Sequence, residues 1–336
     1  MGFVTIRDVA KQAGVSITAV SQILHDKGRF SDDTRQHVME TVREMGYVPD
    51  QRARAMRSTN NNTIGLLVPD LRNQYFANLV SSMEDELYRR GYTTLIGTSS
   101  ENINRQDEFI NGLLGQRIVG AIVVPQGVDT VGIQSLIRSQ LPLVFVDRYV
   151  QGIKSVPFVV SDPYPGIRAA VEELVQLGHR RIGFVSHPSL GSFNVNEREN
   201  SFRKVIRELG MVEATIVSCD ATYESHGAAL DELIDHSVTS ILFSYSPDAI
   251  TVLGLIHDRG VDAQSSISVV SFDDIPVFRL MTPSISVISQ QPEDMGRKGV
   301  EILMQQIADG SSLETKPHYV PTVFIARRSC ERVNKD

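Results

Sequence analysis

VTIRDVAKQAGVSITAVSQIL, residues 4–24, consists of two short amphipathic segments joined by a turn. Thr5 can cap a first helix, and Asp8 three residues later completes a variant of the capping box. Gly14 is suited to the turn that ends this helix, and Ser16 can cap a second one. The stretch therefore predicts a first helix, a tight turn, and a second helix that ends at Leu24.

A third helix is expected between Ser31, which can cap it, and Gly46, which can stop it. The apolar residues of the first two helices recur at helical spacing and would face inward: Val9, Ala10, Ala13, Val20, Ile23 and Leu24. The three helices would together form a small N-terminal headpiece.

The outer face of the second helix carries Ile17, Thr18, Ser21 and Gln22. Their donors, acceptors and methyl groups are of a size that fits the major groove of DNA. An alternative is a helical hairpin that only packs on the rest of the chain, which explains the apolar positions equally well. That alternative does not explain the outer face, so the pattern favours a helix that reads DNA.

The net charge of −7 argues against a nucleic-acid partner, but this charge is unevenly distributed. Residues 1–60 hold nine Lys or Arg and seven Asp or Glu, a net charge of +2, and the remaining residues carry −9. A mildly basic head on an acidic body suits a protein that meets a polyanion at one end. Residues 47–63, YVPDQRARAMRSTNNNT, lack apolar periodicity and predict a linker with a short conditional helix in RARAMR.

From Ile64 onward, apolar strands alternate with amphipathic helices. Strands are expected at residues 64–69, 93–98, 119–125 and 143–147, and a second series is expected at residues 158–162, 181–186, 240–244 and 267–274. Uninterrupted apolar strands with helical crossovers indicate parallel sheets covered on both faces, so two series predict two doubly wound α/β lobes. Ligands of such sheets bind beyond the carboxyl ends of the strands, which places a ligand in the cleft between the lobes.

Several classes of protein are disfavoured by what the sequence lacks. The chain has 336 residues but no apolar run long enough for a membrane span and no signal-peptide pattern, so we expect a cytoplasmic protein without a membrane partner. The motifs of common hydrolases, phosphate-binding loops, dinucleotide folds and zinc proteases are missing. Cys219 and Cys330 have no metal-ligand spacing, and we interpret both as free, packed thiols. We expect neither a cofactor nor a metal site.

Two patterns carry a structural interpretation beside a chemical one. His179 in LGHRRIGF is interpreted as a turn residue between a helix and a strand rather than as a base or a ligand. Asp273 and Asp274 could be a carboxylate pair for acid–base chemistry, but adjacent strand residues point to opposite faces. We expect instead that an aspartate at this strand end binds a polar ligand or the next loop.

Five blocks occur in order along the whole chain and resemble the lactose repressor (LacI) family: VTIRDVAKQAGVS, SDDTRQHVMETVREMGYVP, GLLVPDLRNQYF, ELVQLGHRRIGFVS and SVVSFDD. The resemblance implies a helix-turn-helix DNA-binding headpiece at residues 1–49 and a hinge helix at residues 50–61. It also implies a two-lobed, periplasmic-binding-protein-like core at residues 62–336 that dimerises and binds a small effector.

The resemblance also assigns residues to operator DNA, with base-reading positions at Ile17, Thr18 and Gln22. Positions near the DNA backbone, near neighbouring bases or in the hinge follow from the same blocks: Thr5, Ser16, Ser21, His25, Ser31, Thr34, Tyr47, Ala53, Met56 and Arg57. Gln22 stands where the family often has Arg, and Gln pairs best with adenine whereas Arg favours guanine. Met56 replaces the family's usual Leu but is apolar and flexible enough to enter the minor groove.

The family's effector positions fall on aromatic, charged and hydrogen-bonding groups: Tyr75, Phe76, Asp147, Arg198, Tyr245, Asp273 and Gln291. Such groups suit a polyhydroxylated ligand. Arg198 could instead form a surface ion pair with Glu197 or Glu199. The sequence SYS at residues 244–246 departs from the family's common Asn-Asp, which leaves the identity of the effector open.

These observations predict a dimeric transcriptional regulator that binds a near-palindromic operator and responds to a sugar or sugar derivative. We expect a repressor that the effector releases from DNA. The alternative is a solute-binding protein of a transport system, built on the same core, and residues 1–60 argue against it. An enzyme would need an acid and a base that converge in the cleft, and the sequence offers no convincing pair.

Overall fold

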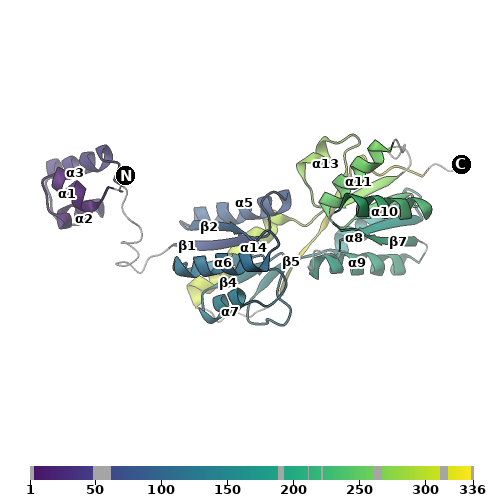
Figure 1. Cartoon of the computed structure of the whole chain (residues 1–336), viewed down its shortest axis with the longest axis horizontal. Coiled ribbons are helices and arrows are strands. Elements are labelled where there is room, and N and C mark those ends of the chain that lie inside the picture. Colours follow the sequence, from purple (N-terminus) through teal and green to yellow (C-terminus); the bar gives the residue numbers. More distant parts are fainter. Residues whose placement is uncertain are drawn as a thin grey trace. The chain divides into compact units, whose positions relative to one another are not determined.

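The computed structural model describes residues 4–47, 62–187, 193–210, 212–220, 222–259, 267–310 and 317–333. The chain divides into two compact units, Met1–Asn61 and Asn62–Asp336, and each is described by itself. Figure 1 shows helices alone in the first unit and two lobes of strands and helices in the second. None of the described helices combines the length and the apolar character that crossing a membrane requires.

The first unit contains α1 (Ile6–Gln12), α2 (Ile17–Leu24) and α3 (Asp32–Glu44). As predicted, the side chains of Thr5, Ser16 and Ser31 cap these helices by accepting hydrogen bonds from first-turn N–H groups. Gly14, between α1 and α2, has a φ of 67°, a conformation that costs residues with a Cβ roughly 1–2 kcal/mol. One small core holds the helices together, with these residues buried: Val9, Ala10, Ala13, Val20, Ile23 and Val38.

The first lobe of the second unit contains a six-stranded sheet in the order β11-β5-β4-β3-β1-β2, with all neighbours parallel. Its strands are β1 (Thr63–Val68), β2 (Thr93–Thr98), β3 (Gly120–Val123), β4 (Leu143–Val146), β5 (Phe158–Asp162) and β11 (Pro317–Pro321). Its helices are α5 (Gln74–Arg89), α6 (Ile103–Gly115), α7 (Val131–Arg138) and α14 (Pro292–Asp309).

The second lobe contains a six-stranded sheet in the order β12-β10-β9-β8-β6-β7, in which β12 runs antiparallel to β10 and the other neighbours are parallel. Its strands are β6 (Arg181–Ser186), β7 (Glu213–Ser218), β8 (Ser240–Phe243), β9 (Ser268–Phe272), β10 (Ser286–Ser289) and β12 (Val323–Ile325). Its helices are α8 (Tyr164–Gln176), α9 (Phe193–Leu209), α10 (Tyr223–Asp235), α11 (Ser246–Asp258) and α13 (Pro276–Leu280).

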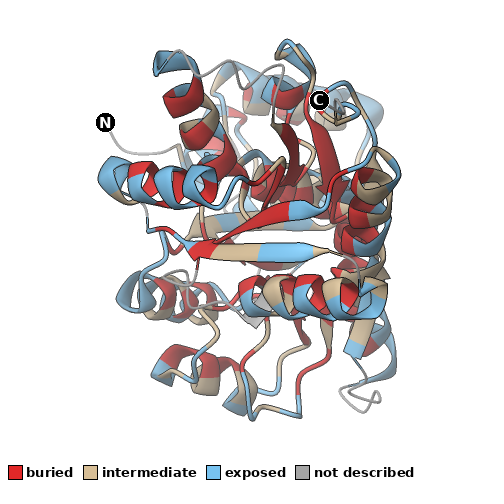
Figure 2. Cartoon of the chain, turned by 90° about the vertical axis from the view of Figure 1, so that its right-hand side faces the viewer, coloured by how far each residue is buried: buried red, intermediate tan, exposed pale blue. Residues whose placement is uncertain are grey.

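Each sheet is covered by helices on both faces. Because successive strand residues point to opposite faces, β1 sends Leu66 into a core with α5 and α14 and Leu67 into a core with α6 and α7. In the same way, β6 sends Val185 toward α10 and α11 and Phe184 toward α8 and α9. Figure 2 shows this arrangement as helices that are buried on the sheet side and exposed outside. The predicted fold of a helix-turn-helix headpiece and two doubly wound, mostly parallel α/β lobes is confirmed.

The expectation that residues 158–162 begin the second series of strands is wrong. These residues form β5, which pairs in parallel with β4 in the first sheet. The chain enters the second lobe after β5, returns to the first lobe at α14, and leaves it again between β11 and β12. Long-range packing decides these crossings, and the local apolar pattern of residues 158–162 does not encode them.

Candidate functional site

The outer face of α2 is exposed to solvent. Ile17 leaves 45% of its surface exposed, Thr18 and Gln22 are also exposed, and Ser21 is half-buried. Val20, on the opposite side of the helix, is fully buried in the core of the first unit. The outer face therefore presents methyl, hydroxyl and amide groups that the packing of the first unit does not use.

Four of the other predicted DNA contacts lie at the ends of α2 and α3. Ser16 and Ser31 are the exposed N-caps, and the Ser31 hydroxyl lies 2.8 Å from the Thr34 hydroxyl. His25 is the C-cap of α2, and its Nδ1 lies 2.6 Å from the carbonyl oxygen of Ser21. In the sequence, these polar residues lie before and after the residues of the outer face of α2.

Thr5 and Tyr47 lie at the two ends of the described part of the first unit. The exposed Thr5 hydroxyl donates to the capping-box carboxylate of Asp8 at 2.6 Å. Tyr47 packs partly against the core of the first unit. The remaining predicted DNA contacts, Ala53, Met56 and Arg57, lie outside the described residues.

Three predicted effector residues meet beyond the carboxyl ends of the first sheet. Tyr75 and Phe76 lie in the first turn of α5, which follows β1, and Asp147 directly follows β4. The Tyr75 hydroxyl donates to Asp147 Oδ1 at 2.7 Å, and the centres of the Tyr75 and Phe76 rings lie 5.1 Å apart in an edge-on contact. All three side chains are buried, although two of them carry polar groups.

Arg148, which the sequence analysis missed, belongs to the same cluster. Its guanidinium lies 5.8 Å from the centre of the Phe76 ring and forms two hydrogen bonds of 2.8 Å with the Glu101 carboxylate. Its Nε lies 3.6 Å from Asp147 Oδ2. Strict strand alternation would send neighbouring side chains to opposite faces, but Asp147 has a left-handed φ of 65° that interrupts this alternation. The position of Arg148 directly after a strand was the available signal.

The second lobe contributes a carboxylate and a guanidinium. Asp273, directly after β9, accepts a hydrogen bond from Gln290 Nε2 at 2.7 Å. Arg198, on α9, lies 4.4 Å from the centre of the Phe272 ring and donates to the Ser244 carbonyl oxygen at 2.5 Å. Arg198 is 6% exposed, and its Nε has no hydrogen-bond partner in the described part of the chain. A buried N–H that is unused in this way is available to a ligand.

The charges of the two lobes act on one another. Burial raises the pKa of Asp147, and the charges of Arg148 and Arg198 oppose this shift. Burial also raises the pKa of Asp273, where Arg198 opposes the shift and the Asp147 charge adds to it. Burial raises the pKa of Tyr75 well above its usual value, and the charges of both aspartates add to this effect. The polar groups of the two lobes therefore belong to one electrostatic site, referred to below as the effector cluster.

Backbone strain marks the same positions. The φ angle is 65° at Asp147, 67° at Asp273 and 56° at Gln291. A left-handed conformation at a residue other than glycine costs of order 1–3 kcal/mol, and such strain is typical of ligand sites. These three residues follow β4, β9 and β10, at the edge of each sheet where the effector cluster lies.

Tyr245 and Gln291 are half-buried at the border of this cluster. Burial raises the pKa of Tyr245; the charges of Asp248, Glu101 and Asp273 add to this shift, and the charge of Arg148 opposes it. Gln291 is the N-cap of α14, and its backbone N–H donates to Ser289 Oγ at 3.2 Å.

Arg198 does not form the surface ion pair that was its alternative interpretation. Its side chain is buried, and its guanidinium donates to a backbone carbonyl group. Glu199 pairs instead with Arg203 at 2.8 Å, and Glu197 accepts a hydrogen bond from Asn200. The buried side of α9 therefore carries Arg198 toward the sheet.

Asp273 and Asp274 do not share a common environment as an acid–base pair would. Asp274 is bound by Arg279 and Arg327. Burial acts to raise the pKa of Asp274, but the hydrogen bonds from these two arginines outweigh it and lower the pKa. Asp273 and Asp274 thus have separate partners, Gln290 for the first and two arginines for the second.

His179 lies between α8 and β6, as predicted. Its Nδ1 is 2.8 Å from Thr239 Oγ1 and its Nε2 is 3.0 Å from the Glu331 carbonyl oxygen. It is buried, and this burial lowers its pKa. His179 therefore connects the segment before β6 to that before β8 and to the C-terminal segment.

Comparison with known proteins finds matches for both parts of the chain, the helices of the first unit and part of the second unit. Residues 5–50 match the bacterial regulatory proteins of the lacI family, and residues 171–330 match a periplasmic binding protein-like domain. The chain belongs to the LacI family. This LacI-family protein is a DNA-binding transcriptional regulator and not an enzyme, with a helix-turn-helix headpiece followed by a periplasmic-binding-protein-like core.

Relatives of this LacI-family protein match it along almost its whole length. The ribose operon repressor of Bacillus subtilis (strain 168) is 28% identical over 330 residues, which cover 98% of this chain and 99% of the relative. The structure of the lac repressor dimer bound to operator and the anti-inducer ONPF has a TM-score of 0.81 at 22% identity and is similar in fold over 98% of this chain and all of its own. The complex of the transcriptional regulator CelR with cellobiose has a TM-score of 0.70 at 25% identity over 97% of this chain and 99% of its own.

Proposed function

We propose that this LacI-family protein is a cytoplasmic repressor that binds a near-palindromic operator as a homodimer and leaves it when a small, sugar-like effector binds. Residues 1–49 read the operator, residues 50–61 form a hinge helix against the DNA, and residues 62–336 bind the effector and dimerise. The observation that carries this proposal is the buried, incompletely hydrogen-bonded effector cluster in a chain that also has an exposed DNA-reading helix.

The operator is read by the outer face of α2. Ile17, Thr18 and Gln22 contact base edges, because they project from the exposed side of the helix and have methyl, hydroxyl and amide groups. The polar residues around them contact phosphates or neighbouring bases and set the register: Thr5, Ser16, Ser21, His25, Ser31, Thr34 and Tyr47. In the hinge, Ala53 and Arg57 contact the DNA, and Met56 enters the minor groove at the operator centre.

The effector binds to Tyr75, Phe76, Asp147, Arg198, Tyr245, Asp273 and Gln291. A sugar hydroxyl can both donate and accept, so it can donate to a carboxylate of the effector cluster and accept from the unused N–H of Arg198. Aromatic surface beside a few convergent polar groups is the usual composition of a small-molecule site. The cellobiose complex of CelR and the ribose operon repressor support a sugar or sugar derivative as the class of effector.

A homodimer is supported by exposed apolar side chains on the second unit. Leu280, at the end of α13, leaves 82% of its surface exposed, and Val277 on the same helix leaves 38%. A two-fold dimer presents two copies of α2, which explains a near-palindromic operator. The dimeric lac repressor, with the same fold, supports this assembly.

The operator can be identified by binding-site selection with the full chain. Deleting residues 1–61 should abolish binding to the selected site, measured by fluorescence anisotropy, because the remaining residues lack α2 and carry a net charge of −9. The intact chain should lose affinity steeply with salt, with each neutralised phosphate adding about −0.9 to the log–log slope. Retained affinity in the deleted chain at physiological salt would disprove this assignment of DNA binding.

The effector can be identified by thermal-shift screening of sugars and phosphosugars. A ligand that binds only the folded chain adds about 2.7 kcal/mol at a concentration of 100 times its Kd. Arg198→Met should lose this stabilisation, and Arg203→Met, which removes an exposed guanidinium from the same helix, should keep it. Equal stabilisation of both variants would place the effector away from the effector cluster.

A further inference from the structure

Four side chains that the proposed function does not use lie together in the second lobe. His187 follows β6 and Cys219 follows β7, while His226 and Asp248 lie in the first turns of α10 and α11. Each of the four is at most 3% exposed. Two imidazoles, a thiol and a carboxylate are thus removed from solvent at one edge of the second sheet.

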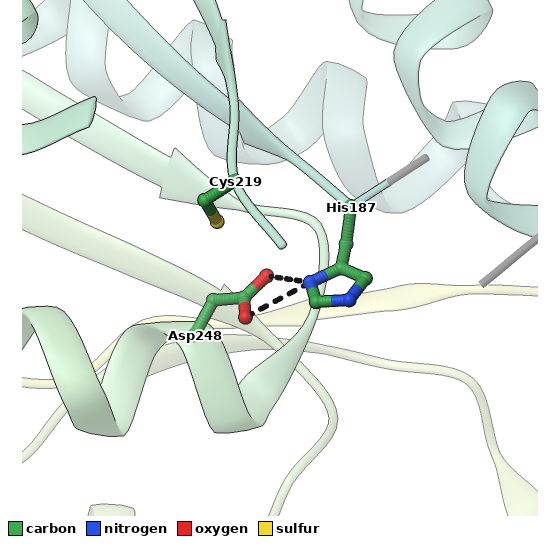
Figure 3. A group of neighbouring side chains, drawn as sticks. All are labelled: His187, Cys219 and Asp248. Carbon is green, nitrogen blue, oxygen red and sulfur yellow. Dashed lines mark hydrogen bonds and ion pairs between the residues drawn. The ribbon is translucent and has the colours of Figure 1, made fainter. Parts of the chain in front are cut away.

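Three of these side chains have the dimensions of a metal site. The potential ligand atoms of His187, Cys219 and Asp248 lie within 4.8 Å of one another, and Figure 3 shows the three side chains directed toward each other. His187 Nδ1 and Asp248 Oδ2 are 2.9 Å apart. Bonds of about 2.0–2.3 Å in a tetrahedral zinc site place neighbouring ligand atoms roughly 3.3–3.8 Å apart. Small side-chain rotations would therefore bring the three ligand atoms around one ion.

His226 indicates that the carboxylate needs a cation beside it. Its Nδ1 lies 2.6 Å from the Thr222 carbonyl oxygen, so this nitrogen must carry a hydrogen and donate it. Its Nε2 lies 2.9 Å from Asp248 Oδ1. In a neutral ring Nε2 is then an acceptor, and it faces a carboxylate oxygen that is also an acceptor. At this distance only a proton between the two atoms makes the contact favourable, so the Asp248 carboxylate faces a positive or hydrogen-bonded partner on this side.

We propose that His187, Cys219 and Asp248 bind one divalent metal ion of the zinc class, and that His226 holds the Asp248 carboxylate in place. Imidazole nitrogen, thiolate sulfur and carboxylate oxygen are the donors that zinc takes in proteins, whereas magnesium and calcium prefer oxygen alone. The hydrogen bond from His226 Nδ1 to a backbone carbonyl group orients the ring so that its other nitrogen faces Asp248, and such support of a ligand is common around metal sites.

Metal binding must displace the proton of the thiol. A cysteine thiol carries a proton that a bound metal ion replaces. The ion binds as this proton leaves, since the thiolate is the ligand form of cysteine.

The metal site borders the effector cluster without sharing its residues. The rings of His187 and Tyr245 lie 5.2 Å apart, and Tyr245 is the N-cap residue of the helix that carries Asp248. A bound ion would join the segments after β6 and β7 to the first turn of α11, and it would hold them beside Tyr245.

Cobalt(II) provides a direct test because it occupies zinc sites and reports thiolate ligation by its absorption. The full chain, without a polyhistidine tag, is treated with a chelator, dialysed and titrated with cobalt(II) and then with zinc(II). We expect one cobalt ion per chain, with a thiolate-to-metal charge-transfer band and the visible bands of a tetrahedral site. Zinc should displace cobalt and remove all of these bands, and it should raise the Tm of the chelator-treated chain.

Matched variants locate the ion. Cys219→Ser should lose the charge-transfer band, and Cys330→Ser, which changes the other free cysteine, should keep it. His226→Gln should weaken cobalt binding by about 10- to 100-fold but retain the thiolate band. Circular dichroism checks that each variant is folded.

The proposal is overturned if the folded, unaltered chain takes up no cobalt, shows no thiolate band, or gains no stability from zinc. It is also overturned if Cys219→Ser binds cobalt with the same band while Cys330→Ser loses it. The titration uses neither operator DNA nor effector, so its result is independent of the proposed repressor function.

Discussion

Replacing Asp273 with asparagine removes one charge from the effector cluster with almost no change in shape. Asp273 is 4% exposed and accepts a hydrogen bond from Gln290 Nε2 at 2.7 Å. Asparagine keeps an oxygen that can accept this bond. It is also among the residues that tolerate a left-handed backbone, and φ is 67° at this position. Asp273→Asn should therefore fold and bind operator DNA as the unaltered chain does.

The effector should bind this variant less tightly. An ionised carboxylate only accepts, and a hydrogen bond from an effector hydroxyl to it is worth about 1.5–3 kcal/mol. At about 1.4 kcal/mol for each factor of ten, its loss weakens effector binding by roughly 10- to 150-fold. Because coupling between two ligands is reciprocal, an effector that binds less of the protein releases less of it from the operator.

Asp274→Asn is the matched control. It makes the same chemical change one residue along the chain, but Asp274 is bound by Arg279 and Arg327 and lies outside the effector cluster. We expect this variant to lose about 1–3 kcal/mol of stability, because two arginines lose a charged partner, and to keep its effector affinity. Calorimetry measures effector binding, and anisotropy with operator DNA measures release.

Two results would refute this reasoning. Unchanged effector affinity in Asp273→Asn, with reduced affinity in Asp274→Asn, would place the effector beside the wrong carboxylate. Loss of operator binding by effector-free Asp273→Asn would show that the residue acts on the DNA-bound state rather than on the effector.

Three further predictions concern the operator, the dimer and pH. Gln22→Arg should shift base preference toward guanine at one symmetric pair of operator positions by ~1–3 kcal/mol, without affecting dimerisation. Binding-site selection on the two proteins measures this shift, and identical motifs would mean that Gln22 contacts no base. Leu280→Glu should weaken the dimer in analytical ultracentrifugation because it buries a charge in the interface. The control Val131→Glu, at a position 74% exposed on α7, should not weaken it, and equal effects of the two variants would exclude α13 from the interface. Burial raises the pKa of Asp273, so ionising this carboxyl group at neutral pH lowers the stability of the folded protein. Asparagine does not ionise, so Asp273→Asn should have the higher Tm at neutral pH. This difference in Tm should shrink as the pH falls through the raised pKa toward the ordinary value of about 3.9, and a difference that grows in acid would contradict the assigned shift.

The headpiece could be predicted almost residue by residue because its signals are local. The caps Thr5, Ser16 and Ser31 each act within one turn of helix, and Gly14 acts through its own φ angle. Each signal requires only residues that are adjacent in the sequence. Physical chemistry over a few residues therefore sets both the helix ends and the face of α2 that remains exposed.

The sequence predicts the doubly wound fold of each lobe but not how the chain passes between the lobes. Buried central strands such as β1 and β8 have continuous apolar sequences and were recognised. Four strands were missed: β7, β11 and β12 have partly exposed sequences, and β10 is buried but has only two apolar residues between serines. The assignment of β5 to the first sheet and the return of α14 to the first lobe depend on tertiary packing, which no local pattern specifies.

The two candidate sites also differ in how far the sequence alone predicts their residues. Asp273 could be proposed from its place at the end of a recognised apolar strand, and Asp147 was assigned by the resemblance to the LacI family. Cys219 stands at the end of β7, an edge strand whose weak apolar pattern gave no such position, and its spacing from Cys330 resembles no metal motif. Its neighbours His187 and Asp248 are 32 and 29 residues away in the chain, and the sheet alone brings them within 4.8 Å of its sulfur. In a parallel sheet every strand ends at the same edge, so recognising one more strand would have placed Cys219 beside both. The metal site was thus hidden by the failure to recognise β7, because its ligands are spaced by strand topology rather than by a short motif.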